Sequence, residues 1–271
     1  LAAARRLADR VVGPRSGAVD ASLSDRRRAM RNVVGACVFG VEIDPTAAEL
    51  CKAALWLASA DRDEPMTYLH ERIRIGDALL GPTPSSPAGA RDALDRLSAE
   101  RRGLDWRLAF AEVFERGGFD AVVGNPPFLN QLESGTAATR DAAAAIRALT
   151  GGIVRGYADL SAAFLLRSVE VCRAGGRVSL VQPQSLLAAA GARDVRRGVL
   201  ARGTLTSLWV SNEHVFDGAS VYTCAPTIEV DGPRRVDLVR SATASFAPLD
   251  PVAIDRDELA EAETWSHLVA S

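Results

Sequence analysis

Two consecutive prolines directly after an apolar segment are the feature that most constrains how this chain can fold. The run Phe119–Gly124 (FDAVVG) has the composition of a strand, and it leads straight into Asn125-Pro126-Pro127-Phe128. Proline has no backbone N–H to donate, so this tetrapeptide can continue neither the strand nor a helix. It must therefore form a loop at the end of the strand, which we call the N-P-P-F loop.

Strand-like and helix-like segments alternate along the chain. Predicted helices cover residues 1–12, 45–57, 159–172 and 192–202. Besides Phe119–Gly124, predicted strands are Val38–Asp44, Ile73–Asp77, Arg177–Gln182, Leu205–Ser211 and Val221–Val230. This alternation is typical of an α/β fold with an open, mostly parallel sheet and crossover helices. The last two strands follow each other closely, which predicts an antiparallel pair at one edge.

Composition separates the chain into a patterned part and a weaker tail. Residues 14–25 and 129–156 are polar and rich in small residues, and residues 81–103 predict an exposed loop with a short helix. After Asp231 the pattern fades, with one further strand predicted near Arg234–Val239. We therefore assign residues 1–230 to one catalytic core and residues 231–271 to a linker or the start of a following region.

Charge, cysteines and histidines exclude several classes of protein. The net charge of -2 argues against a surface coated with basic residues. The four cysteines form no C-x-x-C pair and the three histidines are far apart, so we expect reduced, buried cysteines and no metal site. No apolar run reaches the length of a membrane span and no signal peptide is readable, so we expect a cytoplasmic protein. Leu1 in place of Met indicates processing or a start inside a longer protein.

The N-P-P-F loop carries groups suited to an amine on a flat ring. The side-chain oxygen of Asn125 and the carbonyl of Pro126 can each accept one amine hydrogen, and Phe128 can stack on the ring. Two acceptors on these hydrogens favour a pyramidal nitrogen whose lone pair is free to attack, so no strong general base is needed. The alternative is an ordinary proline turn, which the position after an apolar strand disfavours.

Acidic residues end the two preceding strands. Glu42 can accept hydrogen bonds from both hydroxyls of a ribose, with Ile43 against an adenine face, and Asp77 can accept one from an adenine amine. Asp44 precedes Pro45 and is expected to cap the next helix, and a solvated strand end is the alternative for Asp77. Phe216 is a candidate second aromatic wall, although core packing is the more common role of a lone phenylalanine.

Two further features are weaker. The cluster Arg26–Arg31 could contact phosphate, but a solvated helix face is the favoured interpretation. His214 is more often a surface or hydrogen-bonded histidine than a catalyst.

Taken together, these segments resemble the adenine-N6 DNA methyltransferases that use S-adenosylmethionine, in the branch found in restriction–modification and phage-defence systems. The resemblance spans most of residues 1–230 in segment order. It rests on Val38–Pro45, Glu49–Leu57, Ile75–Leu80, Asp105–Phe114, Gly117–Phe128, Tyr157–Pro183 and Val215–Val221.

This resemblance implies a Rossmann-like methyltransferase sheet and a role for each matching residue. Glu42 would bind the cofactor ribose, and Ile43, Asp77 and Ala78 would contact its adenine. The residues implied in catalysis are Asn125, Pro126, Pro127 and Phe128. Asn125 and Pro126 would hold the target N6, while Phe128 and Phe216 would stack on an adenine flipped out of double-stranded DNA.

The chain departs from the family pattern at its start. The family's glycine-rich cofactor loop and the central strand before it are absent from these residues. We therefore expect a fragment that lacks its first strand, binds S-adenosylmethionine weakly and shows no turnover alone. Target-recognition and nuclease domains would lie outside these residues. The alternatives are an N-P-P-type methyltransferase acting on RNA or on a protein glutamine, and an inactive DNA-binding remnant.

Overall fold

The computed structural model describes residues 1–13, 22–59, 65–83, 86, 103–128, 137–154, 160–215, 221–242 and 246–269. The chain forms two compact units. The first comprises Leu1–Ala78 and Glu100–Leu104, and the second comprises Leu79–Ala99 and Asp105–Ser271. The α/β class predicted from the sequence is confirmed, with both parallel and antiparallel strand pairs.

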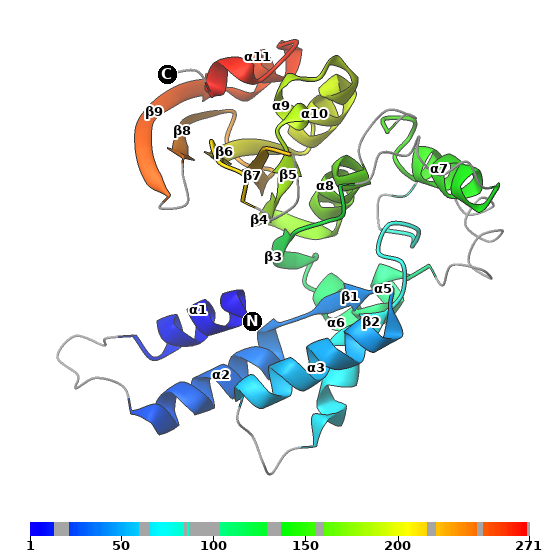
Figure 1. Ribbon diagram of the computed structural model, residues 1–271, viewed down its shortest axis with the longest axis vertical. Coiled ribbons are helices and arrows are strands. Elements are labelled where there is room, and N and C mark those ends of the chain that lie inside the picture. The colour runs from blue at the N-terminus through cyan, green and yellow to red at the C-terminus, as the bar shows by residue number, and fades with distance from the viewer. Residues whose placement is uncertain are drawn as a thin grey trace. The chain divides into compact units, whose positions relative to one another are not determined.

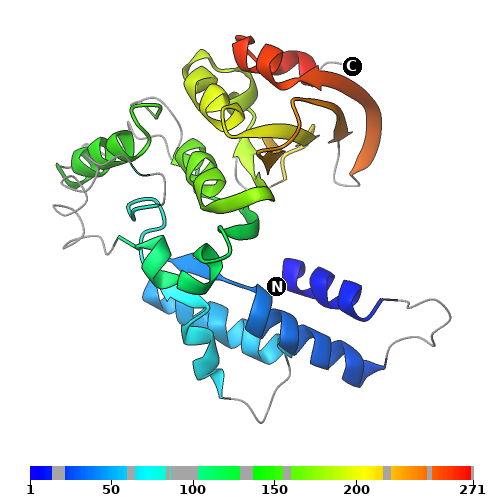
Figure 2. The same ribbon diagram turned by 180° about the vertical axis from the view of Figure 1, so that it is seen from behind.

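The first unit packs helices against a parallel pair of strands (Figure 1). Its elements are α1 (Ala2–Val11), α2 (Leu23–Cys37), β1 (Gly40–Glu42), α3 (Pro45–Ser59), the 3₁₀ helix η1 (Met66–His70) and β2 (Ile73–Ile75). Small and apolar side chains form its core, including Ala4, Ala8, Met30, Val33, Ala48, Leu55 and Leu69. Figure 2 shows α1 and α2 lying side by side, so the alanines of α1 allow a close approach.

The structure of this unit bears on two predictions from the sequence, the strand Val38–Asp44 and the basic cluster Arg26–Arg31. The predicted strand Val38–Asp44 is shorter than expected, because only Gly40–Glu42 pairs with β2. The basic cluster lies on α2, where Arg26 and Arg27 are exposed and Arg28 pairs with Asp25 at 2.5 Å. Arg31, the last residue of the cluster, is half-buried, and the favoured interpretation as a solvated helix face stays a prediction, because exposed arginines are also available to a phosphate.

The second unit is built on a mixed sheet. Its strands are β3 (Phe119–Gly124), β4 (Cys172–Leu180), β5 (Gln182–Pro183), β6 (Gly203–Val210), β7 (Thr223–Val230), β8 (Arg235–Ala242) and β9 (Ala247–Asp255). They are ordered β3-β4-β7-β6-β8-β9, with β5 also paired to β7. The pairs β3–β4 and β6–β8 are parallel, whereas β7 runs antiparallel to β4 and β6, and β9 to β8. Figure 1 shows β9 curving away at the end of this sheet.

Helices cover the sheet and fill the core. They are α5 (Trp106–Ala109), α6 (Ala111–Phe114), α7 (Ala137–Leu149), α8 (Leu160–Val171), α9 (Ser185–Ala188), η2 (Ala190–Ala192), α10 (Arg193–Leu200), α11 (Arg256–Glu261) and η3 (Ser266–Leu268). Of these, α8 is buried along nearly its whole length. Its apolar side chains share one core with β4, β6, β7 and α10, including Leu165, Leu166, Val169, Val178, Val199, Leu205 and Ile228.

Three sequence expectations for this unit were wrong in detail. The antiparallel pair β6–β7 exists but is not at an edge, because β7 lies between β4 and β6. A helix, α7, lies within residues 129–156, for which the sequence predicted no regular element, and its alanines have a high helix propensity. Finally, α8 passes into β4 at Cys172, so the strand predicted at Arg177–Gln182 begins earlier than expected.

The tail beyond residue 230 continues the same sheet. The strand expected near Arg234–Val239 is β8, and β9 pairs with it. Trp265 and Leu268 are each only 1% exposed and belong to the same core as β4 and β6. The assignment of residues 1–230 to a methyltransferase core stays a prediction.

Within the described residues, β3 is an edge strand. It pairs with β4 alone, and Val123 is 65% exposed although the strand is apolar. An apolar parallel strand is normally covered on both sides. The first, central strand expected from the family resemblance stays a prediction.

Candidate active site

The N-P-P-F loop follows β3 at the carboxyl end of the parallel pair β3–β4. The backbone of Val181 donates a hydrogen bond to the carbonyl of Gly124 at 3.0 Å, which fixes the end of the strand. Beyond it Asn125 is exposed, Pro126 is buried and Phe128 is half-buried. The loop therefore presents the Asn125 amide to solvent from an anchored main chain, at the sheet edge where α/β proteins bind ligands.

The start of β3 is anchored by aromatic rings. Phe119 makes edge-on contacts with Trp106, Phe110 and Phe114 at ring-centroid distances of 5.6–5.9 Å. The thiol of Cys172 also donates to the carbonyl of Phe119 at 3.1 Å. Edge-to-face pairs add stability beyond area burial, so β3 is held at both ends.

Glu42 and Asp77 lie at the same end of the parallel pair in the first unit. Glu42 is opposite Ile75 in the register, and the backbone of Gly76 donates to the Glu42 carbonyl at 2.9 Å. Asp77 comes two residues after Ile75, is only 9% exposed, and its carbonyl accepts from the backbone of Leu104 at 3.2 Å. The structure thus brings together the two acids that the sequence singled out.

In the turn after β1, Asp44 caps the next helix, as the sequence predicted, and Glu42 does not. Asp44 Oδ1 accepts from the backbones of Thr46 at 2.7 Å and Ala47 at 2.9 Å, so it caps α3. These N–H groups, that of Ala47 first, hold the pKa of Asp44 below its ordinary value. The Glu42 carboxylate accepts from the Asp44 backbone at 3.0 Å. Ile43 is 55% exposed between them, while Ala78, after Asp77, is half-buried.

The predicted residues fall into two groups. Glu42, Ile43, Asp77 and Ala78 belong to the first unit, and the N-P-P-F loop belongs to the second. Phe216 lies outside the described residues.

One polar contact near the predicted site was not expected from the sequence. The side-chain amide of Gln184 donates to the carbonyls of Ser211 at 2.5 Å and Thr223 at 3.2 Å, and so ties the end of β6 to the start of β7. Next to it, exposed His214 stacks on Tyr222 with ring centroids 4.5 Å apart. Because the strands β3, β4 and β6 point the same way, these groups lie at the sheet edge that carries the N-P-P-F loop. In the sequence, the only local indication of these Gln184 contacts was a glutamine directly after Pro183.

In the part of the chain that the structure describes, no group of three or more His, Cys, Asp or Glu side chains is arranged to hold a metal ion. None of the described helices is both long enough and apolar enough to cross a membrane.

Restriction–modification enzymes are among the solved structures that structural comparison finds to be similar to this chain. A nuclease-deletion mutant of the Type ISP enzyme LlaGI, in complex with a DNA substrate mimic, is 12% identical with a TM-score of 0.53; the match covers 89% of this chain and 23% of that one. The methyltransferase subunit of a type I restriction-modification system from Streptococcus thermophilus is 16% identical with a TM-score of 0.49, covering 91% and 44%. The M protein of EcoKI is 17% identical with a TM-score of 0.46, covering 83% and 38%. The chain thus spans less than half the length of these proteins.

Sequence comparison identifies the family. No curated protein matches the chain. The family model described as Eco57I restriction-modification methylase matches residues 36–216, which include β1, β2, β3 and the N-P-P-F loop. Because this match covers more than half of the 271 residues, the chain belongs to the family of Eco57I restriction-modification methylases.

Proposed function

We propose that this chain carries catalytic residues of a DNA methyltransferase that transfers a methyl group from S-adenosylmethionine to adenine N6 within a restriction–modification or phage-defence system. The observation that carries the proposal is the N-P-P-F loop, with Asn125 exposed and Pro126 buried at the carboxyl end of β3. Membership of the restriction-modification methylase family supports the same reaction class.

The acceptor groups of the first unit fit S-adenosylmethionine. Glu42 and Asp77 present two carboxylates from adjacent parallel strands, and Ile43 offers an exposed apolar face between β1 and α3. We assign Glu42 to the ribose hydroxyls, Asp77 to the adenine amine, and Ile43 and Ala78 to the adenine ring. When bound, the cofactor supplies an electrophilic methyl group on a sulfonium.

The second unit supplies the groups that hold the target amine. In the proposal, Asn125 Oδ1 and the Pro126 carbonyl each accept one N6 hydrogen, which localises the nitrogen lone pair for attack. Pro127 keeps the loop rigid, and Phe128, half-buried at its end, stacks on the adenine ring. Phe216 is proposed as the second stacking residue. The adenine must leave the duplex to reach these groups, so the partner is double-stranded DNA with one base flipped.

The proposal includes further regions of a larger protein besides these 271 residues. The LlaGI structure holds a DNA substrate mimic, and the match covers only 23% of that protein. We propose that regions outside these residues recognise the DNA sequence and, in a combined enzyme, cut it.

The test is methyl transfer by the purified full-length protein. Duplex DNA is incubated with radiolabelled S-adenosylmethionine and digested to nucleosides. We expect N6-methyl-2′-deoxyadenosine from the wild type and a loss of about 100-fold or more from Asn125→Ala, as when one oriented hydrogen-bonding group is removed from an active site. Asn32→Ala, on the exposed surface of α2, is the matched control and is expected to keep full activity.

The same assay separates the proposal from its alternatives. Label in cytosine would contradict it, and so would label that is found only when RNA or a protein glutamine is offered in place of the DNA. So would equal rates for Asn125→Ala and wild type.

A further inference from the structure

A buried ion pair lies in the second unit, outside the residues assigned to the reaction. Arg167 and Glu170, one turn apart on α8, have side chains only 4% and 9% exposed, and Arg167 Nη1 lies 2.6 Å from Glu170 Oε2. Arg202 adds a second ion pair to Glu170 at 3.4 Å. Burying such charges is costly unless further hydrogen bonds satisfy them, so the remaining partners of the pair indicate its role.

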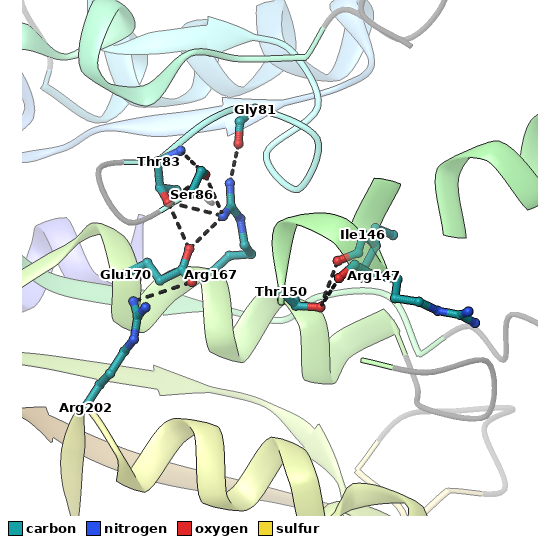
Figure 3. Close-up of polar contacts among 9 residues, drawn as sticks. All are labelled: Gly81, Thr83, Ser86, Ile146, Arg147, Thr150, Arg167, Glu170 and Arg202. Atoms are coloured by element: carbon teal, nitrogen blue, oxygen red, sulfur yellow. Dashed lines mark hydrogen bonds and ion pairs between the residues drawn. The ribbon is translucent and has the colours of Figure 1, made fainter. Parts of the chain in front are cut away.

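Those partners all come from one short segment of chain (Figure 3). Arg167 donates to the carbonyl of Gly81, to Thr83 Oγ1 at 3.2 Å and to Ser86 Oγ at 3.4 Å. Thr83 in turn donates to Glu170 at 2.9 Å. The forked guanidinium thus grips a main-chain carbonyl and two hydroxyls more than eighty residues away in sequence.

The gripped segment directly follows the residues proposed for the cofactor adenine. Asp77 and Ala78 end the first unit, and the chain enters the second unit at Leu79. Leu79 and Leu80 are only 4% and 3% exposed and belong to the core of the second unit. Gly81 comes next, so Arg167 holds the chain four residues after Asp77.

The C-terminal end of α8, which carries Arg167 and Glu170, leads toward the strands that hold the proposed catalytic loop. The helix passes without a loop into β4, which pairs in parallel with β3, and β3 carries Asn125 at its end. Burial lowers the pKa of the Arg167 guanidinium, and the charge of Glu170 opposes this. We call the contacts of Arg167 and Glu170 with Gly81, Thr83 and Ser86 the anchor. The anchor is a charged, hydrogen-bonded link between the segment that enters the second unit and α8, whose strand β4 supports β3.

We propose that Arg167 is a positioning residue for methyl transfer: it fixes where the chain leaving Asp77 enters the unit that carries Asn125. This inference rests on the proposed function. Asp77 itself is held within the first unit by its bridge to Gly103 and by Leu104, so cofactor binding does not depend on the anchor. The proposal concerns the rate of methyl transfer and not cofactor binding, because displacements of reacting groups by about 1 Å can cost about 100-fold in rate.

Two variants weaken the anchor in different ways. Arg167→Lys keeps the charge beside Glu170 but loses the fork that reaches Gly81. Thr83→Val leaves the ion pair and removes the hydroxyl that joins it to the segment. The matched control is Arg196→Lys, because Arg196 is 1% exposed and donates to the carbonyls of Leu186, Ala189 and Glu263 in the same unit.

The experiment measures kcat for DNA methylation, S-adenosylmethionine affinity by calorimetry and Tm for each full-length protein. We expect kcat to fall about 10- to 100-fold in Arg167→Lys and Thr83→Val, with affinity within about twofold of wild type. Arg196→Lys should lower Tm at least as much and keep kcat near wild type. The proposal is overturned if the two anchor variants keep wild-type kcat. It is equally overturned if kcat and affinity fall together with Tm in all three variants.

Hydrogen exchange separates this inference from the proposed function. A wild-type protein that transfers no methyl group to DNA refutes the function. Exchange at the amides of residues 79–83 then judges the anchor by itself. Faster exchange in Arg167→Lys and Thr83→Val supports the anchor, and wild-type exchange overturns it.

Discussion

Replacing Gly118 by alanine tests whether close main-chain packing fixes the start of β3. Gly118 has φ +128°, and a Cβ built there would lie 2.6 Å from the carbonyl oxygen of Val171 and 3.0 Å from the nitrogen of Arg173. Backbone strain at positive φ costs about 1–2 kcal/mol, and forcing backbone atoms apart costs about 1–3 kcal/mol more. We therefore expect a loss of about 2–5 kcal/mol, which lowers Tm by about 10 °C in a chain of this size.

Gly152→Ala provides the matched control, because it separates strain from overlap. Gly152 has φ +82°, but no atom lies within 4 Å of a Cβ placed there. Only the strain remains, so Tm should fall by about 4 °C. Thermal unfolding followed by circular dichroism gives both values. Equal losses for Gly118→Ala and Gly152→Ala would refute the packing argument.

The remaining predictions concern the turn after β1 and the thiols. Asp44→Ala should lower Tm at pH 7, whereas Asp44→Asn, which can still cap α3, should not. Because the pKa of Asp44 is lowered on folding, the stability that its carboxylate contributes is present above about pH 4 and is lost as the pH falls through the lowered pKa. In a pH series of Tm, the advantage of the wild type over Asp44→Ala should therefore vanish in acid. Glu42→Gln should weaken S-adenosylmethionine binding about 10- to 100-fold in calorimetry with Tm unchanged, and unchanged affinity would contradict the ribose assignment. Cys51 is exposed, contrary to the buried cysteines that the sequence predicted, so iodoacetamide at pH 8 should modify it. The reagent should spare Cys172 and Cys224, because burial raises the pKa values of these thiols to about 11 and about 12. Mass spectrometry of the peptides checks this, and rapid labelling of Cys224 would contradict its burial.

Local patterns were sufficient to predict the elements that carry the candidate site. The strand before Asn125, the acids after β1 and β2, and the cap at Asp44 all follow from short-range chemistry, and the structure has each of them. The exposure of Asn125 also follows, because two prolines deny the loop any regular structure.

Long-range contacts and competing propensities explain what the sequence did not predict. The anchor between Arg167 and Gly81 joins residues 86 positions apart, and its only signal was a charged pair inside an otherwise apolar helix. The helix α7 was missed because residues 129–156 were interpreted only as polar and rich in small residues, although alanine is the best helix former. The central position of β7 depends on which strands pair, and spacing along the chain does not determine that.

Mapping of methylated bases in cells that express the full gene tests the central claim most directly. The proposal predicts N6-methyladenine at one defined DNA sequence in the wild type, and its loss in Asn125→Ala with the protein still present at wild-type level. Asn32→Ala should leave the methylation intact. Adenine methylation that persists in Asn125→Ala, or its absence from wild-type cells, would contradict the account.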